Sequence, residues 1–460
     1  MSTVIEDTVR NTICCGCGVC TTLCPSHCLK MQWNIDGEYN PVKVSNCNTE
    51  CGICLSVCPF ANNNSNEDKI GQELYGNFEN ISHTPETGFY LSSGVGFVTS
   101  EEARLHSVSG GLTTWLLQKL LEKNVVDTVL CVTATNDPDR LFKFTVAKTN
   151  EEIYVAAGSA YYPVEMSEVL SYMVQNQGNY ALVGVPCFLK AVRLAQSKNK
   201  ILQERLKICV GLVCGLIPNK HLVTYMGYTV GINDPITQVN FREKLEDKNA
   251  GIYSTRMNSV ASGMLSTTWD KNQISYARQL FGLHSCDCCD DVFAEVADVT
   301  FMDAWLPKYS SDWRGTSIYL TRLPVIEALI EEGIKENELT ISPIDIEEVI
   351  LSQKPRLDRK RGAVLSYKIE CMKEAGYNIP TKRSTHHPAK LSAFEKYKQK
   401  RILTQKYECR KEFRSHNYTP DLMKEWFEKE SPLPPAVRIL TFPLRAIKFG
   451  ISLLRRWIHL

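Results

Sequence analysis

Apolar and polar positions follow two rhythms between residues 95 and 340 of this 460-residue chain. Short apolar runs rich in β-branched residues alternate with segments in which apolar residues recur every three or four positions. The first pattern indicates buried strands and the second amphipathic helices. Strands are predicted over 125–133, 180–185 and 208–213, and helices over 112–123, 166–175, 188–196 and 324–336. This order predicts βαβ units and a parallel sheet.

The remaining segments depart from this rhythm. Alternating residues at 238–241 and 263–269 favour antiparallel strands, and 297–305 indicates a strand that runs into a loop. Residues 61–90 are polar, and charge dominates after about 355. We therefore predict an α+β protein with five parts: a cysteine-rich module (1–62), a linker (63–94), an α/β domain with a mixed sheet (95–355), a charged helical extension (356–430) and a basic amphipathic tail (431–460).

Charge and composition narrow the functional classes. The 52 basic and 51 acidic residues give a net charge of +1, which argues against a nucleic-acid binder because such proteins carry a basic face. The sequence has no apolar run long enough to span a membrane and no targeting pattern at its N-terminus. Nineteen cysteines in such a chain indicate metal sites in a reducing compartment. We therefore expect a cytoplasmic location.

Two cysteine runs define the N-terminal module. The first is C-x2-C-x2-C-x3-C-P and the second keeps C-x2-C-x3-C-P, which is the spacing of two-cluster bacterial ferredoxins. In such proteins the last cysteine of each run ligates the other 4Fe–4S cluster. Cluster one is thus assigned to Cys14, Cys17, Cys20 and Cys58, and cluster two to Cys24, Cys47, Cys51 and Cys54. One departure is the extra residue between Cys47 and Cys51.

A third cluster is indicated further along the chain. Cys187 and Cys214 follow two predicted parallel strands, so both are expected at the edge where open α/β sheets build their sites. Cys286 and Cys289 form a CxxC pair, which would complete a set of four thiolates. Two alternatives remain open: these are ordinary buried cysteines, or Cys288 replaces Cys289.

A glycine turn precedes the helix predicted at 112–123. Ser109, Gly110 and Gly111 could let backbone N–H groups approach an anion at the start of this helix. Because Ser and Gly are also good N-cap residues, the residues alone favour a plain helix cap over an anion site.

Several short motifs together resemble the coenzyme F-420 hydrogenase/dehydrogenase beta-subunit family. They occur in the family's order, at Ser107–Gly111, Ala157–Tyr161, Val183–Cys187, Leu212–Cys214, Phe241–Lys244, Cys286 with Cys289–Asp290, and Glu295–Asp298. The resemblance implies that the 95–355 domain binds FAD and a 4Fe–4S cluster, and it favours the third cluster. In the namesakes of the family the electron acceptor is a deazaflavin.

The resemblance also suggests which residues contact FAD. The first candidates are the turn residues Gly110 and Gly111, with Ser107 and Ser109 as hydroxyl donors, and the second are Gly158, Ser159 and Tyr161. The family usually has Lys where this chain has Ala160, which suggests altered substrate handling. Arg242, Lys244 and Asp303 could line the same cleft, and Asp298 or His106 could supply a proton.

These features predict an iron–sulfur flavoprotein oxidoreductase that passes electrons between its clusters, FAD and a small molecule. That substrate is expected to belong to a polysaccharide pathway or to resemble a deazaflavin. The first alternative is an electron-transfer subunit that feeds a separate catalytic partner. The second is a structural cluster protein with a vestigial flavin site. The expected protein partner is a redox donor or acceptor such as a ferredoxin.

The C-terminal tail has its own chemistry. After the prolines of 431–435, its basic residues fall in one sector of a helical wheel and apolar residues fill most of the rest. Contact with the inner face of a membrane and docking onto protein are equally good interpretations. Upstream, His386 and His387 favour a solvated pair over a metal site.

Overall fold

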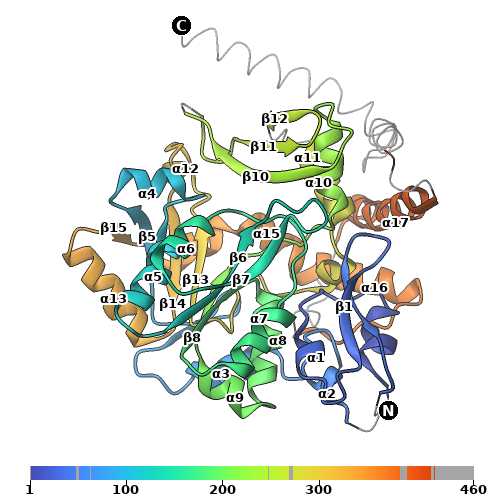
Figure 1. Ribbon diagram of the computed structural model, residues 1–460, viewed down its shortest axis with the longest axis horizontal. Coiled ribbons are helices and arrows are strands. Elements are labelled where there is room, and N and C mark those ends of the chain that lie inside the picture. The colour runs from blue at the N-terminus through green and yellow to red at the C-terminus, as the bar shows by residue number, and fades with distance from the viewer. Residues whose placement is uncertain are drawn as a thin grey trace, which may run out of the picture.

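An eight-stranded mixed sheet forms the centre of the protein in its computed structural model (Figure 1). The structure describes residues 2–47, 51–62, 64–246, 248–268, 273–383, 391–415 and 419. The strand order is β15-β5-β14-β13-β9-β8-β6-β7. In chain order these strands are β5 (Ser92–Val98), β6 (Thr128–Ala134), β7 (Phe142–Ala147), β8 (Tyr180–Gly184), β9 (Leu206–Leu212), β13 (Val299–Asp303), β14 (Ser317–Thr321) and β15 (Leu339–Pro343).

The middle of this sheet is parallel, as the sequence predicts. β6, β8, β9 and β13 pair in parallel, whereas β7, β14, β5 and β15 join as antiparallel strands. The carboxyl ends of the four parallel strands therefore lie at one edge, where α/β sheets place their sites. The predicted mixed sheet is confirmed.

Helices cover both faces of the central sheet. On one face lie α5 (Leu112–Glu122) and α13 (Pro324–Lys335), which share an apolar core with the strands. On the other face lie α7 (Ser167–Gln175), α8 (Pro186–Gln196) and α9 (Lys200–Arg205). This second core also contains cysteines of the N-terminal module, so the module and the sheet share one apolar interior.

A smaller sheet lies above the carboxyl edge of the central one, at the top of Figure 1. It contains β10 (Ile236–Lys244), β11 (Tyr253–Ser259) and β12 (Gly263–Thr268), all antiparallel, and packs with α10 (His221–Tyr228) and α11 (Gln273–Phe281). The sequence predicts its two outer strands but misses β11, whose residues are mostly polar. The expected last residue of the outer strand, 269, lies outside the described residues.

The N-terminal module repeats one local structure. It comprises the π-helix η1 (Ile5–Val9), α1 (Val19–Thr22), β1 (Leu29–Trp33), β2 (Tyr39–Lys43) and α2 (Ile53–Ser56). In both cysteine runs a glycine in the left-handed region precedes the short helix: Gly18 has φ 82° and Gly52 has φ 60°. Glycine reaches this conformation without a steric penalty, which allows the chain to wrap tightly between cysteines.

The segment predicted as a linker, 63–94, is folded against the sheet. It contains α3 (Glu67–Tyr75), β3 (Ser82–Thr84) and β4 (Gly88–Tyr90). The buried Arg322 donates hydrogen bonds to the carbonyls of Thr87 and Phe89. Because a buried guanidinium needs most of its donors satisfied, these contacts fasten the segment to the sheet. Its polar residues caused the linker prediction, yet one of them, Asn66, caps α3.

The described part of the charged extension is helical, as predicted, and it packs against the rest of the protein. After α14 (Ile346–Ser352) come α15 (Lys354–Lys360), α16 (Gly362–Glu374) and α17 (Ala393–Ser415). Figure 1 shows α16 and α17 beside the N-terminal module, and Arg410 on α17 pairs with Glu38 over 2.6 Å. His386, His387 and the 431–460 tail lie outside the described residues. No helix in the described part of the chain could cross a membrane.

Candidate cofactor cavity and cysteine sites

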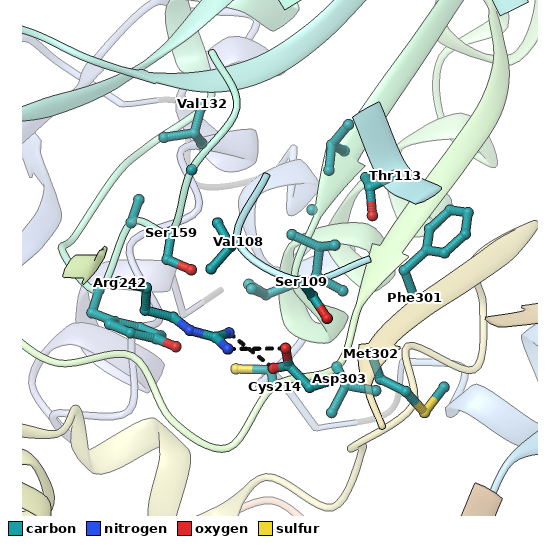
Figure 2. A pocket seen from close by; sticks show the side chains of 18 of the residues that line it. Val108, Ser109, Thr113, Val132, Ser159, Cys214, Arg242, Phe301, Met302 and Asp303 are labelled. Carbon is teal, nitrogen blue, oxygen red and sulfur yellow. Dashed lines mark hydrogen bonds and ion pairs between the residues drawn. The ribbon is translucent and has the colours of Figure 1, made fainter. Parts of the chain in front are cut away.

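A cavity of about 330 Å³ opens at the carboxyl edge of the central sheet. Its walls come from the start of α5, from residues 156–162, and from the loops after β8, β9 and β13. Figure 2 shows Ser109, Ser159, Arg242 and Asp303 around it, and Cys214 also lines it. Residues from five separate segments thus meet at the edge where the sequence predicts a site.

The start of α5 is suited to an anion. Gly111 has φ 84° and is the N-cap, and no side chain caps the first N–H groups of the helix. Leu112, Thr113 and Thr114 of this turn line the cavity. Uncapped N–H groups and the positive end of the helix dipole attract a phosphate or carboxylate. This geometry suits the phosphates of a nucleotide cofactor.

Gly110 in the same turn has a packing role. A Cβ atom built there would lie 2.5 Å from the carbonyl oxygen of Gly96 and 2.8 Å from the nitrogen of Ser317. Only glycine lets the turn approach β5 and β14 this closely. Gly110 therefore acts by placing α5, although the sequence suggests a direct contact with FAD.

The two serines of this turn both line the cavity. The Ser107 hydroxyl donates to the carbonyl of Ala103 and the Ser109 hydroxyl to that of Thr316, each over 2.9 Å. Each hydroxyl has one proton, so both reach a ligand only as acceptors. The expected role as hydroxyl donors to FAD stays a prediction, which requires each hydroxyl to turn away from its backbone partner.

Lys244 supports the turn from behind. It is not among the residues that line the cavity, and its ammonium donates to the carbonyls of Ser109 and Arg104. Burial, followed by the nearby Arg104 and Arg242 charges, lowers the pKa of Lys244 to about 7. Lys244 thus positions the turn, whereas the sequence suggests that it lines the cleft.

The second predicted contact segment forms another part of the wall. Gly158, Ser159, Ala160 and Tyr161 all line the cavity, and a Cβ at Gly158 would meet no atom within 4 Å. Burial alone would raise the pKa of Tyr161, but Arg242 and other nearby arginines outweigh it and the pKa is lowered. The open space beside Gly158 leaves room for a ligand.

Neither proposed proton donor belongs to the cavity. Asp298 is buried in an ion pair with Arg193 (2.7 Å) and also accepts hydrogen bonds from Tyr75 and from the backbone of Cys209. His106 ends α4 (Glu101–His106), stacks on Tyr154 and is exposed. Neither residue lines the cavity, so the structure does not bring the two suggested proton donors to this site.

The first group of thiols in the N-terminal module agrees with predicted cluster one. Burial, then Cys17, Cys14 and Cys58, raise the pKa of Cys20, so these four thiols are neighbours. The backbone N–H of Gly16 donates to Sγ of Cys14 over 3.4 Å. Hydrogen bonds of this kind tune cluster sulfurs in iron–sulfur proteins.

The second group of thiols contains one additional cysteine. Cys54 interacts electrostatically with Cys51 and Cys47, as expected for cluster two. Cys28, which is fully buried, lies 3.4 Å from Cys24 between the two Sγ atoms and also contacts Cys47. The structure thus connects Cys24 to this group through Cys28, a residue that the spacing argument leaves out.

The third group forms below the cavity. Cys187 lies in the first turn of α8 and Cys214 follows β9. Burial raises the pKa of Cys214 to about 11, and the thiols of Cys187 and Cys289 raise it further. Cys286, in η2 (His284–Cys288), interacts with Cys214 and Cys289. Cys288 and Cys289 each donate to a backbone carbonyl, of Ser285 and Asp291 respectively, but the thiols that act most strongly on Cys214 are Cys187 and Cys289. This placement favours Cys289 over Cys288 as the fourth ligand.

Burial disfavours ionisation of several of these thiols, among them Cys14, Cys20 and Cys286. Burial raises the pKa of Cys58 to about 12, for example. Binding of iron would displace the thiol protons, because a coordinated thiol is deprotonated. Among the described His, Cys, Asp and Glu side chains, no three converge as ligands of a single metal ion do.

Comparison with known families identifies the family of the chain. A family profile described as coenzyme F420 hydrogenase/dehydrogenase, beta subunit N-term, matches residues 95–171, and its C terminus counterpart matches 177–347. Together these matches cover more than half of the chain. The chain belongs to this family. The matched region contains the cavity and all four cysteines of the third group.

Two proteins of known name are similar to this chain. The chain is 22% identical over 302 residues to the coenzyme F420-dependent sulfite reductase of Methanocaldococcus jannaschii. The match covers 64% of this chain and 43% of that protein, so the chain spans less than half of its relative. A chain in the F420-reducing [NiFe] hydrogenase complex of Methanosarcina barkeri has the same fold, with TM-score 0.50 and 16% identity over 66% of this chain and 99% of that one.

In this member of the F420 hydrogenase/dehydrogenase beta subunit family, a buried lysine touches the third thiol group. The Lys360 ammonium lies 3.2 Å from Sγ of Cys289 and donates to the carbonyls of Asp291 (2.9 Å) and Cys214 (3.4 Å). Burial would lower the pKa of Lys360, but the thiols outweigh it and raise the pKa. The charged extension therefore contributes directly to the site.

Sequence reasoning missed other residues that line the cavity. Thr113 and Thr114 line the cavity from the turn that the glycines already mark, so their place was open to prediction. Arg278 and Arg356 also line it, from α11 and α15. Nothing in their local sequence signals this, because tertiary packing alone brings those helices to the sheet edge.

Proposed function

We propose that this chain is an electron-transfer oxidoreductase subunit that serves a separate catalytic partner. It relays electrons between 4Fe–4S clusters and a redox cofactor in the cavity. The observation that carries this proposal is that Cys214 belongs both to the cavity wall and to the third thiol group. A cluster on those cysteines would border the cofactor directly. The two clusters of the N-terminal module would complete the route to a redox protein such as a ferredoxin.

FAD is the cofactor that we propose for the cavity. When bound, it supplies two-electron chemistry towards an organic molecule and one-electron exchange with clusters. The first turn of α5, after Gly111, would hold its phosphates, and the open side of Gly158 would leave room for it. Tyr161 and Ser159 would face it from the same wall.

Coenzyme F420 is one candidate for the molecule that exchanges electrons with the cofactor, because both relatives carry it in their names. Ala160 stands where the family usually has Lys, and this favours altered handling of that molecule. The Arg242–Asp303 ion pair, with N–O distances of 3.0 and 3.1 Å, would fix the wall that it meets. Such a paired arginine is rigid enough to orient a ligand.

A second candidate function is an enzyme that acts on its own small molecule. The cavity favours this candidate in one respect, because it extends past the α5 turn to Arg242, Asp303 and Trp305 and so exceeds a phosphate site. A substrate could be accommodated there beside the cofactor.

Anaerobic purification and reconstitution test the proposal. The subunit function predicts bound FAD and ~12 iron atoms per chain, from three four-iron clusters. It also predicts that low-potential reduction of the clusters reduces the flavin, and that only coenzyme F420 or a partner protein reoxidises it. Reoxidation by another small molecule, with no partner protein present, would favour the enzyme. Clusters without any flavin would leave a structural cluster protein.

A further inference from the structure

The wall of the cavity opposite α5 is rich in arginine. Arg242 comes from β10, Arg278 from α11 and Arg356 from α15, and all three line the cavity. Among the described lining residues the single carboxylate is Asp303, which Arg242 engages with two nitrogens. The wall therefore carries more positive than negative charge.

Arg356 contributes to this excess of positive charge, and its contacts are well defined. Its Nη1 donates to Oε1 of Gln353 over 2.7 Å, which is a neutral amide. Its side chain lies over the backbone of Gly215, where an added Cβ would be 3.5 Å from Nε. Burial lowers the pKa of Arg356, Asp303 and Tyr161 act against this effect, and the charge of Arg278 adds to it. Because Arg242 already engages both oxygens of Asp303, a further anion would stabilise the buried guanidinium.

The next cations on the same helix have different positions. Lys360 contacts the thiols, as described above, and Arg359 is not among the residues that line the cavity. On α15, Lys360 is therefore the cation in direct contact with a thiol, whereas Arg356 lines the cavity and acts on Cys214 only electrostatically.

We propose that Arg278 and Arg356 bind an anionic group, a phosphate or a carboxylate, of a molecule in this part of the cavity. The inference deepens the proposed function because it names the chemical class of a ligand. Guanidinium groups recognise such anions through paired hydrogen bonds. The anion can come from two sources, the cofactor's phosphates or an acidic group of the electron-exchange partner.

The first part of the test measures anion binding to the full-length, reconstituted chain. Pyrophosphate and citrate are titrated into wild type, Arg356→Gln and Arg278→Gln, with Arg359→Gln as the matched control one turn along α15. A charged hydrogen bond contributes about 1.5–3 kcal/mol, so each cavity variant should weaken binding by roughly tenfold or more. Arg359→Gln should stay close to wild type. Equal loss in all three variants, or no binding by wild type, would overturn the proposal.

The second part identifies the source of the anion. Riboflavin, FMN and FAD are titrated into the same proteins. Weaker FAD and FMN binding with unchanged riboflavin binding assigns the arginines to the cofactor's phosphates. Unchanged flavin binding with weaker citrate and pyrophosphate binding assigns them to the exchange partner. Either result supports an anion site.

Two controls keep the outcomes separate. Iron content and thermal unfolding confirm that each variant is folded and loaded, and Arg356→Lys, which keeps the charge but not the planar fork, should bind more weakly than wild type and better than Arg356→Gln. If wild type binds these anions but never transfers electrons from clusters to a flavin, the proposed function fails while the anion site stands.

Discussion

At the scale of the residue, Lys360 is the side chain with the clearest electrostatic consequence. A positive charge 3.2 Å from a ligand sulfur favours the reduced cluster, which carries one more electron. We predict that Lys360→Met makes the reduction potential of the third cluster more negative and leaves the two N-terminal clusters unchanged. A redox titration followed by electron paramagnetic resonance measures each potential.

The charge can be separated from the packing of that lysine. Lys360→Arg keeps the cation and should restore most of the potential. Lys354→Met on the same helix removes an exposed lysine paired with Asp358, and it should change nothing. An unaltered third potential in Lys360→Met would show that the contact has no electronic role.

The third cluster itself is testable through two cysteines. We predict that Cys187→Ser or Cys214→Ser lowers the iron content by about four atoms per chain, because a cubane needs four thiolates. The signals of the N-terminal clusters should persist. Cys288→Ser is the matched control, since its thiol donates to Ser285 instead of joining the group. Full iron content in Cys214→Ser would refute the assignment.

Single residues also show which parts of the candidate site can be predicted from the sequence. Cys187, Cys214, Cys286 and Cys289 were predictable, because parallel strands send their carboxyl ends to one edge. Asp298 was not, since an aspartate that ends a motif looks the same whether it holds a proton for catalysis or pairs with a buried Arg193. Lys360 lies in a Lys- and Arg-rich stretch, so its burial is a tertiary fact without a local signal.

At the scale of the element, the start of α5 carries the cofactor argument. Gly111 has φ 84°, and a Cβ there would lie 2.8 Å from Cγ2 of Val98. We predict that Gly111→Ala lowers the thermal midpoint and the flavin content, because the residue must leave the left-handed region and shift the first turn. The strain alone amounts to about 1–2 kcal/mol.

Gly231 supplies a control with the same backbone conformation. Its φ is 88°, but a Cβ there would meet no atom within 4 Å. Gly231→Ala should therefore show a similar conformational cost and normal flavin content. Calorimetry and the absorbance of released flavin give both readouts, and equal flavin loss in the two variants would contradict a specific role of the α5 turn.

Elements with strong periodicity were predictable and the others were not. α5, α7, α8, α13 and the parallel strands agree with the sequence pattern within a few residues. β5 contains two glycines and no regular apolar pattern, because Gly94 and Gly96 leave space for Tyr319 and β15. The helix and strands of 63–94 were hidden by polar residues that cap and pair instead of facing solvent.

At the scale of the molecule, backbone and thiol hydrogen bonds join the N-terminal module to the domain that contains the central sheet. The backbone N–H of Met166 donates to the carbonyl of Cys17, and Cys15 is hydrogen-bonded to both Cys17 and Cys187. One buried contact therefore connects the first predicted cluster with the third. Cys47 and Cys51, predicted ligands of cluster two, are only half-buried, so we expect that cluster to exchange electrons with an outside protein.

This arrangement predicts an order of electron flow through cluster two, cluster one, the third cluster and the cavity, in either direction. Cys15 lies between the last two clusters of that route without being needed as a ligand. We predict that Cys15→Val keeps full iron and flavin content but slows flavin reduction by reduced ferredoxin severalfold in rapid-mixing experiments. Cys15→Ser, which retains a hydrogen-bond donor, should be less impaired, and Cys371→Ser on α16 should match wild type. Loss of iron in Cys15→Val would instead make Cys15 a ligand, and an unchanged rate would mean that electrons leave the module elsewhere.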